Sequence, residues 1–428
     1  ALAEIIVVGG NQHKVGEDIF PESATWSFSL RKGWDLGMNP VSPGYLAWQD
    51  MASVGDGSAL MFGGMNDSLR DVGETFLFNV SGLAAWNRLK LVPSLAQLQA
   101  PPARAFHTMS PLSRSEGIVL LFGGRTNSKP HHAKCDTWLF RKGEGIEGVW
   151  EQWSGGEGYS CSDVKGPSAR WSARSASLGD NRRVLLFGGY NAASGDLSNI
   201  YDDSYIFVLN GDGSDRWTRG WTDSLETSDT PPARSGHAMA TLVEGRVVMF
   251  GGWDGNDMFE DTWIFEENDD ADGYGFDWIQ IAQVGKDRGP RRRRGFSMAN
   301  LGPNRVIASF GYGFPYYQAD TWMFFATDIV NKTRPAYAWM KLRSGNIVQP
   351  QGRAYHQMCN LGSKSVLLYG GEQMDISNSL PMRKISGDTW LLKDGCPAGY
   401  HELKIRNNNG SSASNSGGCV KCPKGRFK

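Results

Sequence analysis

The sequence predicts an all-β protein that folds as a seven-bladed β-propeller, and three repeating features carry this prediction. Glycine pairs recur along the 428 residues, with first glycines at positions 9, 63, 123, 188, 251 and 370, and a degenerate Gly-Tyr-Gly begins at position 311. An aromatic strand follows each pair, and a strand with a tryptophan follows most of these. Self-similarity at steps of 54 to 65 residues indicates a repeat architecture, and four-stranded sheets repeated around a ring form a propeller.

The repeat is clearest at residues 246–265. Residues 246–250 are apolar and β-branched, as in a buried strand, and Gly251-Gly252 ends this strand where the backbone must turn. Residues 261–265 alternate polar and apolar side chains, as in an antiparallel strand with one buried face. We therefore expect a hairpin that supplies the second and third strands of a blade.

Two further strands complete each predicted blade. A tryptophan strand follows the hairpin, with Trp86, Trp153, Trp217 or Trp221, Trp278 and Trp339. An arginine strand precedes it, with Arg104, Arg170, Arg234, Arg294 and Arg353, and with His107, His237 and His356 in three copies. Because these histidines recur at one repeat position, we expect buried imidazoles hydrogen-bonded to backbone between blades rather than catalytic groups.

Together these features resemble the kelch family, whose repeat is an arginine, glycine and histidine strand, an apolar strand ending in two glycines, an aromatic strand and a tryptophan strand. The resemblance covers nearly all of residues 1–394, which we expect to form the propeller domain. The first repeat, residues 1–40, shows no template for an innermost strand. We expect the missing end strand either upstream of Ala1 or in the tail at residues 400–406.

Composition and charge exclude several classes of function. The net charge of −1 and a pI near 6.7 argue against nucleic acid or an anionic membrane as the main partner. No apolar run approaches the roughly 18 residues of a membrane span. No serine, cysteine or carboxylate stands in a catalytic motif. We therefore expect no enzyme and no cofactor, and because the chain begins at Ala1 rather than at methionine, we expect a piece of a longer protein.

Basic and aromatic residues in the loops are the candidate partner-binding residues. Arg291, Arg292 and Arg293 precede the arginine assigned to the repeat, and three extra cations in one loop could dock an acidic partner. A solvated loop is the alternative. The candidate aromatic contacts, for which burial under a neighbouring loop is equally open, are Trp253, Tyr316 and Tyr317.

One acidic loop resembles the start of a calcium-binding loop. Asn268, Asp270 and Asp272 offer oxygen donors at alternate positions, followed by a glycine. The twelfth position is Ile279, where a calcium loop needs a bidentate acid. The interpretation we favour is a hairpin turn, with calcium as the alternative.

Two cysteines of the third predicted blade lie at the ends of neighbouring strands. Cys135 precedes the aromatic strand and Cys161 lies in the loop that leaves the next strand, so a local disulfide is sterically reasonable. His131 and His132 stand close by but lack a second cysteine or an acid at metal-ligand spacing. Cys359 falls in an inner strand, where we expect a buried free thiol.

Residues 395–428 change in composition and predict a separate segment. The pattern C-P-x-G-Y followed by C-x-x-C-P-x-G-x-F resembles the cysteine-rich ephrin-receptor-like repeats of extracellular proteins. This resemblance implies a disulfide between Cys396 and Cys419, with Cys422 joined to a cysteine beyond Lys428. Such modules need an oxidising environment.

The sequence thus favours a non-catalytic interaction or structural module of a larger secreted or cell-surface glycoprotein, similar in plan to attractin-like proteins. We expect it to bind other proteins through propeller loops, within a large extracellular assembly. The alternative is a propeller enzyme or a carbohydrate-binding lectin that uses the central channel. The candidate glycosylation sites, all at strand ends or in loops, are Asn66, Asn79, Asn331 and Asn409.

Overall fold

The computed structural model describes most of the chain between residues 43 and 393. The described ranges are 43–79, 85–91, 100–126, 132–154, 166–191, 199–212, 214–219, 230–268, 275–282, 289–327, 336–342, 350–362, 365–375 and 382–393. Outside them it describes only strands, at 5–8, 14–15, 18–19, 24–29, 33–38, 400–402 and 419–421.

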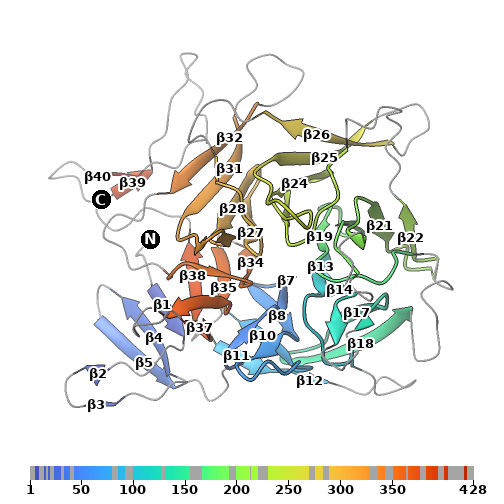
Figure 1. Ribbon diagram of the computed structural model, residues 1–428. Helices are drawn as coiled ribbons and strands as arrows, with labels where there is room; N and C mark the ends of the chain where they lie inside the picture. Colours follow the sequence, from blue (N-terminus) through green and yellow to red (C-terminus); the bar gives the residue numbers. More distant parts are fainter. Residues whose placement is uncertain are drawn as a thin grey trace.

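Six sheets, each with a core of four antiparallel strands, stand around a central axis, and Figure 1 looks along that axis. The innermost strands are β7 (Asp50–Gly55), β13 (Thr108–Ser113), β19 (Arg174–Ser177), β23 (Ala238–Val243), β27 (Ser297–Gly302) and β34 (Gln357–Gly362). The second strands are β8 (Ser58–Phe62), β14 (Ile118–Phe122), β20 (Arg183–Phe187), β24 (Arg246–Phe250), β28 (Arg305–Ser309) and β35 (Ser365–Tyr369). The second strands carry the apolar, β-branched runs seen in the sequence, and they are almost wholly buried.

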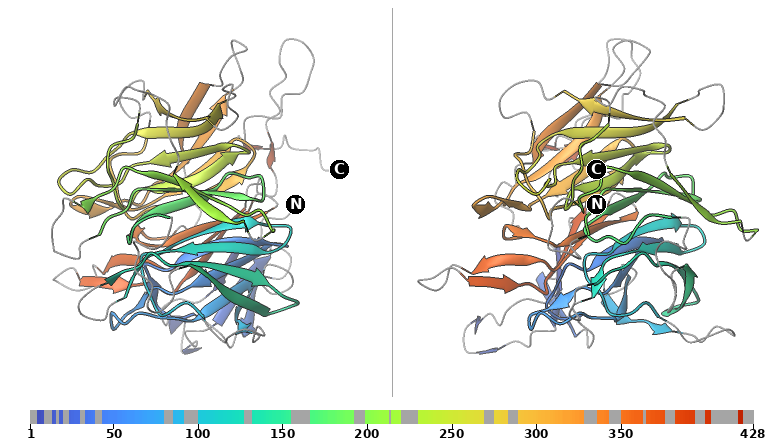
Figure 2. Two further views of the ribbon diagram at one scale, coloured as in Figure 1. Left: turned by 90° about the vertical axis from the view of Figure 1, so that its right-hand side faces the viewer. Right: turned by 45° about the vertical axis from the view of Figure 1, so that its right-hand side comes forward.

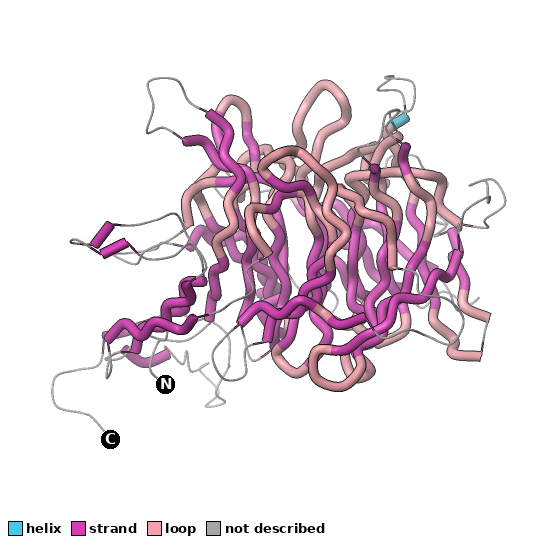
Figure 3. The backbone as a smooth tube through the Cα atoms, turned by 90° about the horizontal axis from the view of Figure 1, so that it is seen from below, coloured by secondary structure: helices cyan, strands magenta, loops and turns pink. Residues whose placement is uncertain are grey.

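The outer half of each blade follows the same order. The third strands are β10 (Thr75–Asn79), β17 (Thr137–Lys142), β21 (Ser204–Val208), β25 (Thr262–Asn268), β31 (Thr321–Thr327) and β38 (Thr389–Lys393). The fourth strands are β11 (Ala85–Arg88), β18 (Glu147–Ser154), β22 (Arg216–Arg219), β26 (Gly275–Ile281), β32 (Ala336–Leu342) and β1 (Ile5–Val8). Figure 3 shows these strands running between two faces built of loops and turns.

The predicted all-β propeller is confirmed, but its ring closes with six blades where the sequence predicted seven. Each innermost strand contacts the next around the circle, and β34 contacts β7. The repeat at residues 1–40 supplies no innermost strand, so β1, β4 (Ala24–Ser29) and β5 (Gly33–Met38) continue the sheet outward from β38. The β1 strand therefore takes the fourth place of the last blade.

Several short strands lie outside the four core strands of each blade. The tail strands β39 (Tyr400–Glu402) and β40 (Cys419–Lys421) pair with each other, so the tail does not supply the missing strand of the last blade, which was one of the two alternatives. The hairpin of β36 (Glu372–Asp375) and β37 (Met382–Ile385) projects from the body in the right-hand view of Figure 2. The other short strands are β2 (Lys14–Val15), β3 (Asp18–Ile19), β6 (Leu46–Ala47), β9 (Met65–Asn66), β12 (Lys90–Leu91), β15 (Arg125–Thr126), β16 (His132–Ala133), β29 (Tyr312–Gly313), β30 (Tyr316–Tyr317) and β33 (Arg353–Ala354).

A buried arginine ties the inner part of five blades to the third strand of the same blade. In one of them Arg234 donates to both oxygens of Asp261 at 2.7 Å and to the carbonyl of Gly251 at 3.0 Å. Such paired, two-pronged hydrogen bonds satisfy a buried guanidinium. The equivalent pairs are Arg104 with Asp136, Arg170 with Asp203, Arg293 with Asp320, and Arg353 with Asp388. The arginine of the fifth blade is thus Arg293, and the prediction that Arg294 fills this role is wrong.

A tryptophan on the fourth strand of five blades anchors that blade to the one before it. Its indole N–H donates to a hydroxyl on the neighbour's third strand, as Trp150 does to Thr75 at 3.1 Å. The other bonds run from Trp86 to Thr389, Trp217 to Thr137, Trp278 to Ser204 and Trp339 to Thr262. Trp150 therefore takes the place that the sequence assigned to Trp153.

The three predicted repeat histidines lie between blades, as expected. His107, His237 and His356 are buried, and each packs edge-on against a phenylalanine of the preceding blade, as His237 does against Phe187 at 5.6 Å. None of their ring nitrogens has a hydrogen bond of good geometry among the described residues. The backbone of Phe62 nevertheless interacts with His107, and that of Ser309 with His356, so the expected backbone contact from the preceding blade is present, though distorted, at two of the three histidines. Burial holds the pKa of each imidazole well below 6.5, and the nearby repeat arginine lowers it further.

Candidate binding site at the channel mouth

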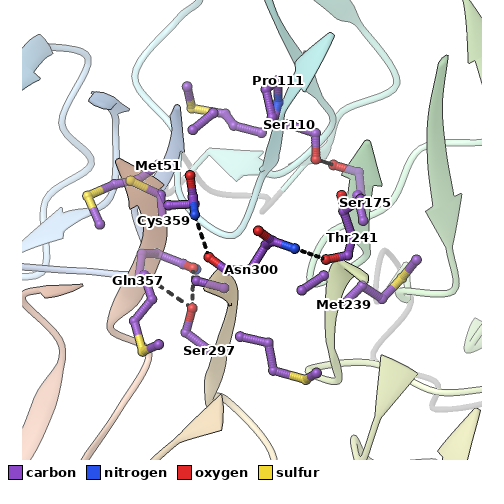
Figure 4. Close-up of a pocket in the computed structure, with 18 of the residues that line it drawn as sticks. Met51, Ser110, Pro111, Ser175, Met239, Thr241, Ser297, Asn300, Gln357 and Cys359 are labelled. Carbon is purple, nitrogen blue, oxygen red and sulfur yellow. Dashed lines mark hydrogen bonds between the residues drawn. The ribbon is translucent and has the colours of Figure 1, made fainter. Parts of the chain in front are cut away.

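Side chains fill the central channel. The innermost strands of all six blades line it, and the cavity that remains measures about 80 Å³. Liquid water takes about 30 Å³ per molecule, so this volume holds only a few waters. Side chains reach from blade to blade across it: Asn300 donates to the carbonyl of Thr241 at 2.8 Å, and Ser110 and Ser175 share a hydrogen bond of 2.8 Å (Figure 4).

An ion pair spans two blades inside the channel. Asp50 accepts hydrogen bonds from the backbone of Met51 at 2.8 Å and of Met109 at 2.7 Å, and lies 3.8 Å from the guanidinium of Arg174. Burial raises the pKa of Asp50 to about 6, against the opposing effect of Arg174. Asp50 thus links the first blade to the second through Met109 and to the third through Arg174.

At the end of the channel where the innermost strands begin, a ring of backbone hydrogen bonds surrounds the axis. One residue per blade donates its N–H to the carbonyl of the equivalent residue of the neighbouring blade, at 2.5 to 3.1 Å. The donors and acceptors run Trp48 to Tyr355, Tyr355 to Gly295, Gly295 to Gly236, Gly236 to Ser172, Ser172 to Phe106, and Phe106 to Trp48. We call these six residues the mouth ring. The entrance to the channel is therefore bordered by the hydrogen-bonded backbone of these six residues.

All six residues of the mouth ring have left-handed backbone, with φ between 52° and 63°. Glycine adopts this conformation freely, whereas a bulky side chain in it costs about 1–2 kcal/mol. Three bulky residues nevertheless occupy adjacent blades: Trp48, Phe106 and Tyr355, with Trp48 centred 5.5 Å from each of the other two rings. The opposite half consists of Ser172, Gly236 and Gly295. The mouth ring therefore has an aromatic half and a half with small side chains.

A second layer of side chains surrounds the mouth ring, and it contains two arginines stacked on aromatic rings. The guanidinium of Arg125 lies 4.5 Å from the ring of Trp171, and that of Arg294 lies 4.7 Å from the ring of Trp253. Trp171 in turn stacks on Tyr190 at 4.5 Å. Such cation–π contacts hold the arginine side chains in place while their charge stays on the protein surface.

The basic and aromatic residues predicted as partner contacts fall into two groups. Arg291 and Arg292 are exposed, Tyr316 is 74% exposed, and Trp253 is half-buried under Arg294. Arg293 is buried in its ion pair and cannot meet a partner, which corrects that part of the prediction. Tyr317 is half-buried and donates to Glu372.

The sequence analysis did not single out Phe314, the most exposed aromatic residue among those described on the face around the mouth ring. Phe314, at the tip between β29 and β30, is 79% exposed. It also missed Trp48, Phe106 and Tyr355, although the latter two share one position in the copies R-A-F-H and R-A-Y-H. This shared position in the repeat was the sequence signal that could have identified these two aromatic residues.

A groove of about 410 Å³ opens beside the aromatic half of the mouth ring. Trp48 and Leu69, which is 54% exposed, form one side, and Arg383 and Ile385 of the projecting hairpin form the other. This volume is in the range of small-molecule and side-chain pockets. The groove therefore extends the candidate surface toward the last blade.

The residues of the calcium, cysteine and glycan predictions lie partly inside and partly outside the described ranges. Asn268 ends β25, while Asp270 and Asp272 lie outside the described residues. Within the described part of the chain no group of three metal-ligating side chains occurs. Cys135 is disulfide-bonded, and its predicted partner Cys161 lies outside the described residues.

Cys359 is confirmed as a buried free thiol, and burial raises its pKa to about 12. The side chains of Cys396 and Cys419 and the sites Asn331 and Asn409 lie outside the described residues. Asn66 and Asn79 are partly exposed at strand ends. No helix among the described residues is long and apolar enough to cross a membrane.

Comparisons with known proteins agree with the fold. Residues 151–371, more than half of the chain, match the family described as the KLHDC2/KLHL20/DRC7 Kelch-repeats domain. The chain is similar to Adagio-like protein 3 of Oryza sativa subsp. japonica, with 23% identity over 351 residues that cover 80% of this chain and 46% of that protein. It is also similar to Multiple epidermal growth factor-like domains protein 8 of Homo sapiens, with 26% identity over 256 residues that cover 60% of this chain and 8% of that protein.

The chain thus spans less than half the length of either relative. Among solved structures, that of YjhT superimposes with a TM-score of 0.51 at 13% identity and covers 81% of this chain and 99% of that one. At this identity the likeness supports the fold alone.

Proposed function

The chain belongs to the kelch-repeat family, and from this premise we propose that it is a non-catalytic protein-interaction module of a larger secreted or cell-surface protein. The face around the mouth ring is its binding surface. The observation that carries this proposal is the arrangement of that face: exposed aromatic tips, stacked arginines and a groove surround an entrance narrowed by backbone hydrogen bonds. Exposed aromatic and arginine side chains are the residues most often enriched in protein interfaces.

Three further observations support the extracellular part of this proposal. Structural disulfides are rare in reducing compartments, and Cys135 is disulfide-bonded. One relative is named for its epidermal growth factor-like domains, and it matches 60% of this chain. Asn66, the first residue of an N-glycosylation motif, lies partly exposed on the mouth face.

The alternative, an enzyme or lectin that works in the central channel, has less support. A cavity of about 80 Å³ is far below the roughly 300 Å³ of the smallest ordinary ligand sites. The polar groups inside are used in bonds between blades, as in Asp50 with Met109 and Asn300 with Thr241. A ligand would have to break these bonds to enter.

Site-specific photo-crosslinking tests the proposal. The protein is secreted from animal cells with a photoreactive amino acid at Phe314 on the mouth face, or at Glu244 in the exposed turn at the opposite end of β23. We expect discrete crosslinks to extracellular proteins from position 314 and none above background from position 244. Crosslinks from both positions alike, or from 244 alone, would rule out the mouth face as the binding surface.

A further inference from the structure

We propose that the groove beside the mouth ring holds the protein's own N-linked glycan, attached at Asn66, with its first sugars packed against Trp48 and Leu69. This inference rests on the proposed function, because N-linked glycans are added to secreted and cell-surface proteins. It assigns an occupant to the groove of about 410 Å³ between the first and last blades. The glycan would then cover the last-blade side of the binding face.

The side chain of Asn66 is held by one of its polar atoms, which leaves the other for a sugar. Its Oδ1 accepts hydrogen bonds from the backbone N–H groups of Ser68 at 3.1 Å and of Arg70 at 2.9 Å. Within the described part of the chain, its Nδ2 donates to no acceptor. A glycan replaces one hydrogen of Nδ2 and leaves Oδ1 unchanged, so both backbone bonds are kept.

The attachment uses a donor supplied by the cell. A bond forms between Nδ2 of Asn66 and C1 of N-acetylglucosamine, while the bond from C1 to the pyrophosphate oxygen of a lipid-linked sugar breaks. The proton lost by Nδ2 leaves with the lipid pyrophosphate. Asp67 and Ser68 complete the Asn-x-Ser motif that this transfer requires.

Asn66 lies at the rim of the groove. It ends β9, and its partner in the antiparallel pair is Leu46 of β6. The N–H of Leu69 donates to the Asn66 carbonyl at 2.9 Å and closes a tight turn, and Asp67 and Leu69 of this turn line the groove. A glycan on Asn66 thus begins one residue from the groove. This position favours the attached glycan over a partner's side chain as the occupant.

The apolar side chains of the groove match one face of a sugar ring. Leu69 is 54% exposed, and Trp48 is partly buried. Both have left-handed backbone, with φ of 56° and 61°, which costs free energy in residues with large side chains. Positions held at such a cost cluster at ligand sites. The C–H groups on one face of a pyranose would bury the leucine and contact the electron-rich face of the indole.

The charged side chains of the groove favour a neutral ligand. Asp67 and Glu372 contribute two negative charges, and Arg383 and Lys384 contribute two positive charges. The carboxylate of Glu372 already accepts a hydrogen bond from Tyr317 and lies 3.4 Å from the guanidinium of Arg383. A charged ligand would be attracted by one pair and repelled by the other. The hydroxyl and amide groups of N-acetylglucosamine carry no charge, and they both donate and accept hydrogen bonds.

Site-resolved deglycosylation of the full chain, secreted from animal cells, tests the inference. A peptide N-glycosidase releases the glycans in oxygen-18 water and marks each released site as labelled aspartate, which mass spectrometry follows. We expect Asn66 to carry a glycan that the folded protein releases at least about tenfold more slowly than the denatured protein, because the packed sugars must first leave the groove. Asn79, which ends β10 at the opposite end of the blade, is the reference sequon and should show a smaller difference.

Two variants in the turn show whether the groove protects the glycan. Leu69→Ser removes an apolar wall, and Arg70→Ser changes an exposed neighbour that does not line the groove. We expect Leu69→Ser to speed release from the folded protein at least about threefold, since it removes apolar contact with the sugar, and Arg70→Ser to have less effect. Thermal unfolding shows whether each variant is folded, and the comparison of folded with denatured parent protein needs no variant.

Three results would overturn the inference. A bare Asn66 beside occupied sequons elsewhere would remove the site and leave the extracellular setting standing. Equal release from folded and denatured protein, or equal effects of the two serine variants, would show that the glycan lies outside the groove. Bare asparagines at all four sequons would overturn the inference together with the extracellular setting, and crosslinking from position 314 would still decide whether the mouth face binds proteins.

Discussion

The indole N–H of Trp86 donates to the hydroxyl of Thr389 at 2.9 Å, and this bond joins residues 303 positions apart in the chain. Trp86 belongs to the first complete blade and Thr389 to the last. The same bond recurs between blades that follow each other in sequence, as between Trp150 and Thr75. The ring is therefore closed by the contact that also joins its consecutive blades.

The first prediction concerns that closure. Thr389→Val keeps the side-chain shape but removes the acceptor and leaves the Trp86 N–H buried without a partner. An unsatisfied buried donor costs about 1–3 kcal/mol. We expect Thr389→Val and its internal control Thr75→Val to lower the free energy of unfolding by similar amounts in this range, measured by urea denaturation. A loss at Thr75 with none at Thr389 would show that the ring is not closed as described.

The second prediction concerns the buried ion pairs. Arg234→Met leaves the Asp261 carboxylate without its main partner, and breaking a buried pair costs about 3–5 kcal/mol. The control is Arg88→Met, because the Arg88 and Glu74 side chains are 66% and 41% exposed and an exposed pair contributes at most about 1 kcal/mol. Thermal unfolding of both variants measures the difference. Equal losses of stability in the two variants would contradict the conclusion that the buried repeat arginine contributes more than an exposed ion pair.

The third prediction concerns acid. The pKa of buried His237 lies well below 6.5, so below pH 6.5 the unfolded chain binds a proton that the folded chain does not, and the free energy of unfolding falls as the pH falls. Each such histidine contributes about 1.4 kcal/mol per pH unit until its folded pKa is reached. Asp50, with a pKa of about 6, acts in the opposite direction from pH 6 down to 3.8.

The variant His237→Phe isolates the histidine contribution. In the next blade Phe296 occupies the equivalent position and packs on Phe250 at 5.6 Å, so a phenylalanine fits this site. We expect urea denaturation at pH 7 and pH 5 to show a smaller acid destabilisation in the variant than in the parent protein. An unchanged difference between the two pH values would mean that His237 binds a proton as readily in the folded chain.

The fourth prediction concerns the backbone of the mouth ring. Gly236 has a φ of 63°, and an added Cβ would come no closer than 3.5 Å to any atom, so Gly236→Ala adds only conformational strain of about 1–2 kcal/mol. Gly295 has nearly the same φ, but its added Cβ would lie 2.6 Å from the Tyr355 ring. We therefore expect Gly295→Ala to be the more destabilising of the two by thermal unfolding. The opposite order would contradict the described packing of Tyr355 on Gly295.

Much of the propeller could be predicted from sequence because each blade repeats the same local pattern. The hairpin at residues 246–265 appears as β24 and β25, with Gly251 at the turn. The number of blades could not be predicted, because it depends on whether β34 meets β7, and this contact has no local sequence signal. An incomplete repeat looks the same in sequence whether it forms a blade or extends one.

The binding site was harder to predict, because residues that are adjacent in the sequence have different roles in the structure. Arg293 and Arg294 are adjacent in a run of four arginines, and only their three-dimensional neighbours show that Arg293 is structural and Arg294 faces the mouth. From the run alone, Arg291, Arg292 and Arg293 were all predicted to be contacts of an acidic partner. The mouth ring was not predictable, because left-handed backbone at Phe106 and Tyr355 follows from bonds to other blades rather than from local preference.

Hydrogen exchange at the amides of the mouth ring tests the central claim most directly, namely that backbone bonds narrow the entrance so that partners bind on the surface around it. Mass spectrometry of the intact chain would follow peptides that contain Phe106, Tyr355 and, as an exposed control, the turn at residues 144–146. We expect the amides of Phe106 and Tyr355 to exchange far more slowly than those of the control turn, although they lie outside the main strands. Exchange as fast as in the control turn would show an open mouth and return the central channel to consideration as the binding site.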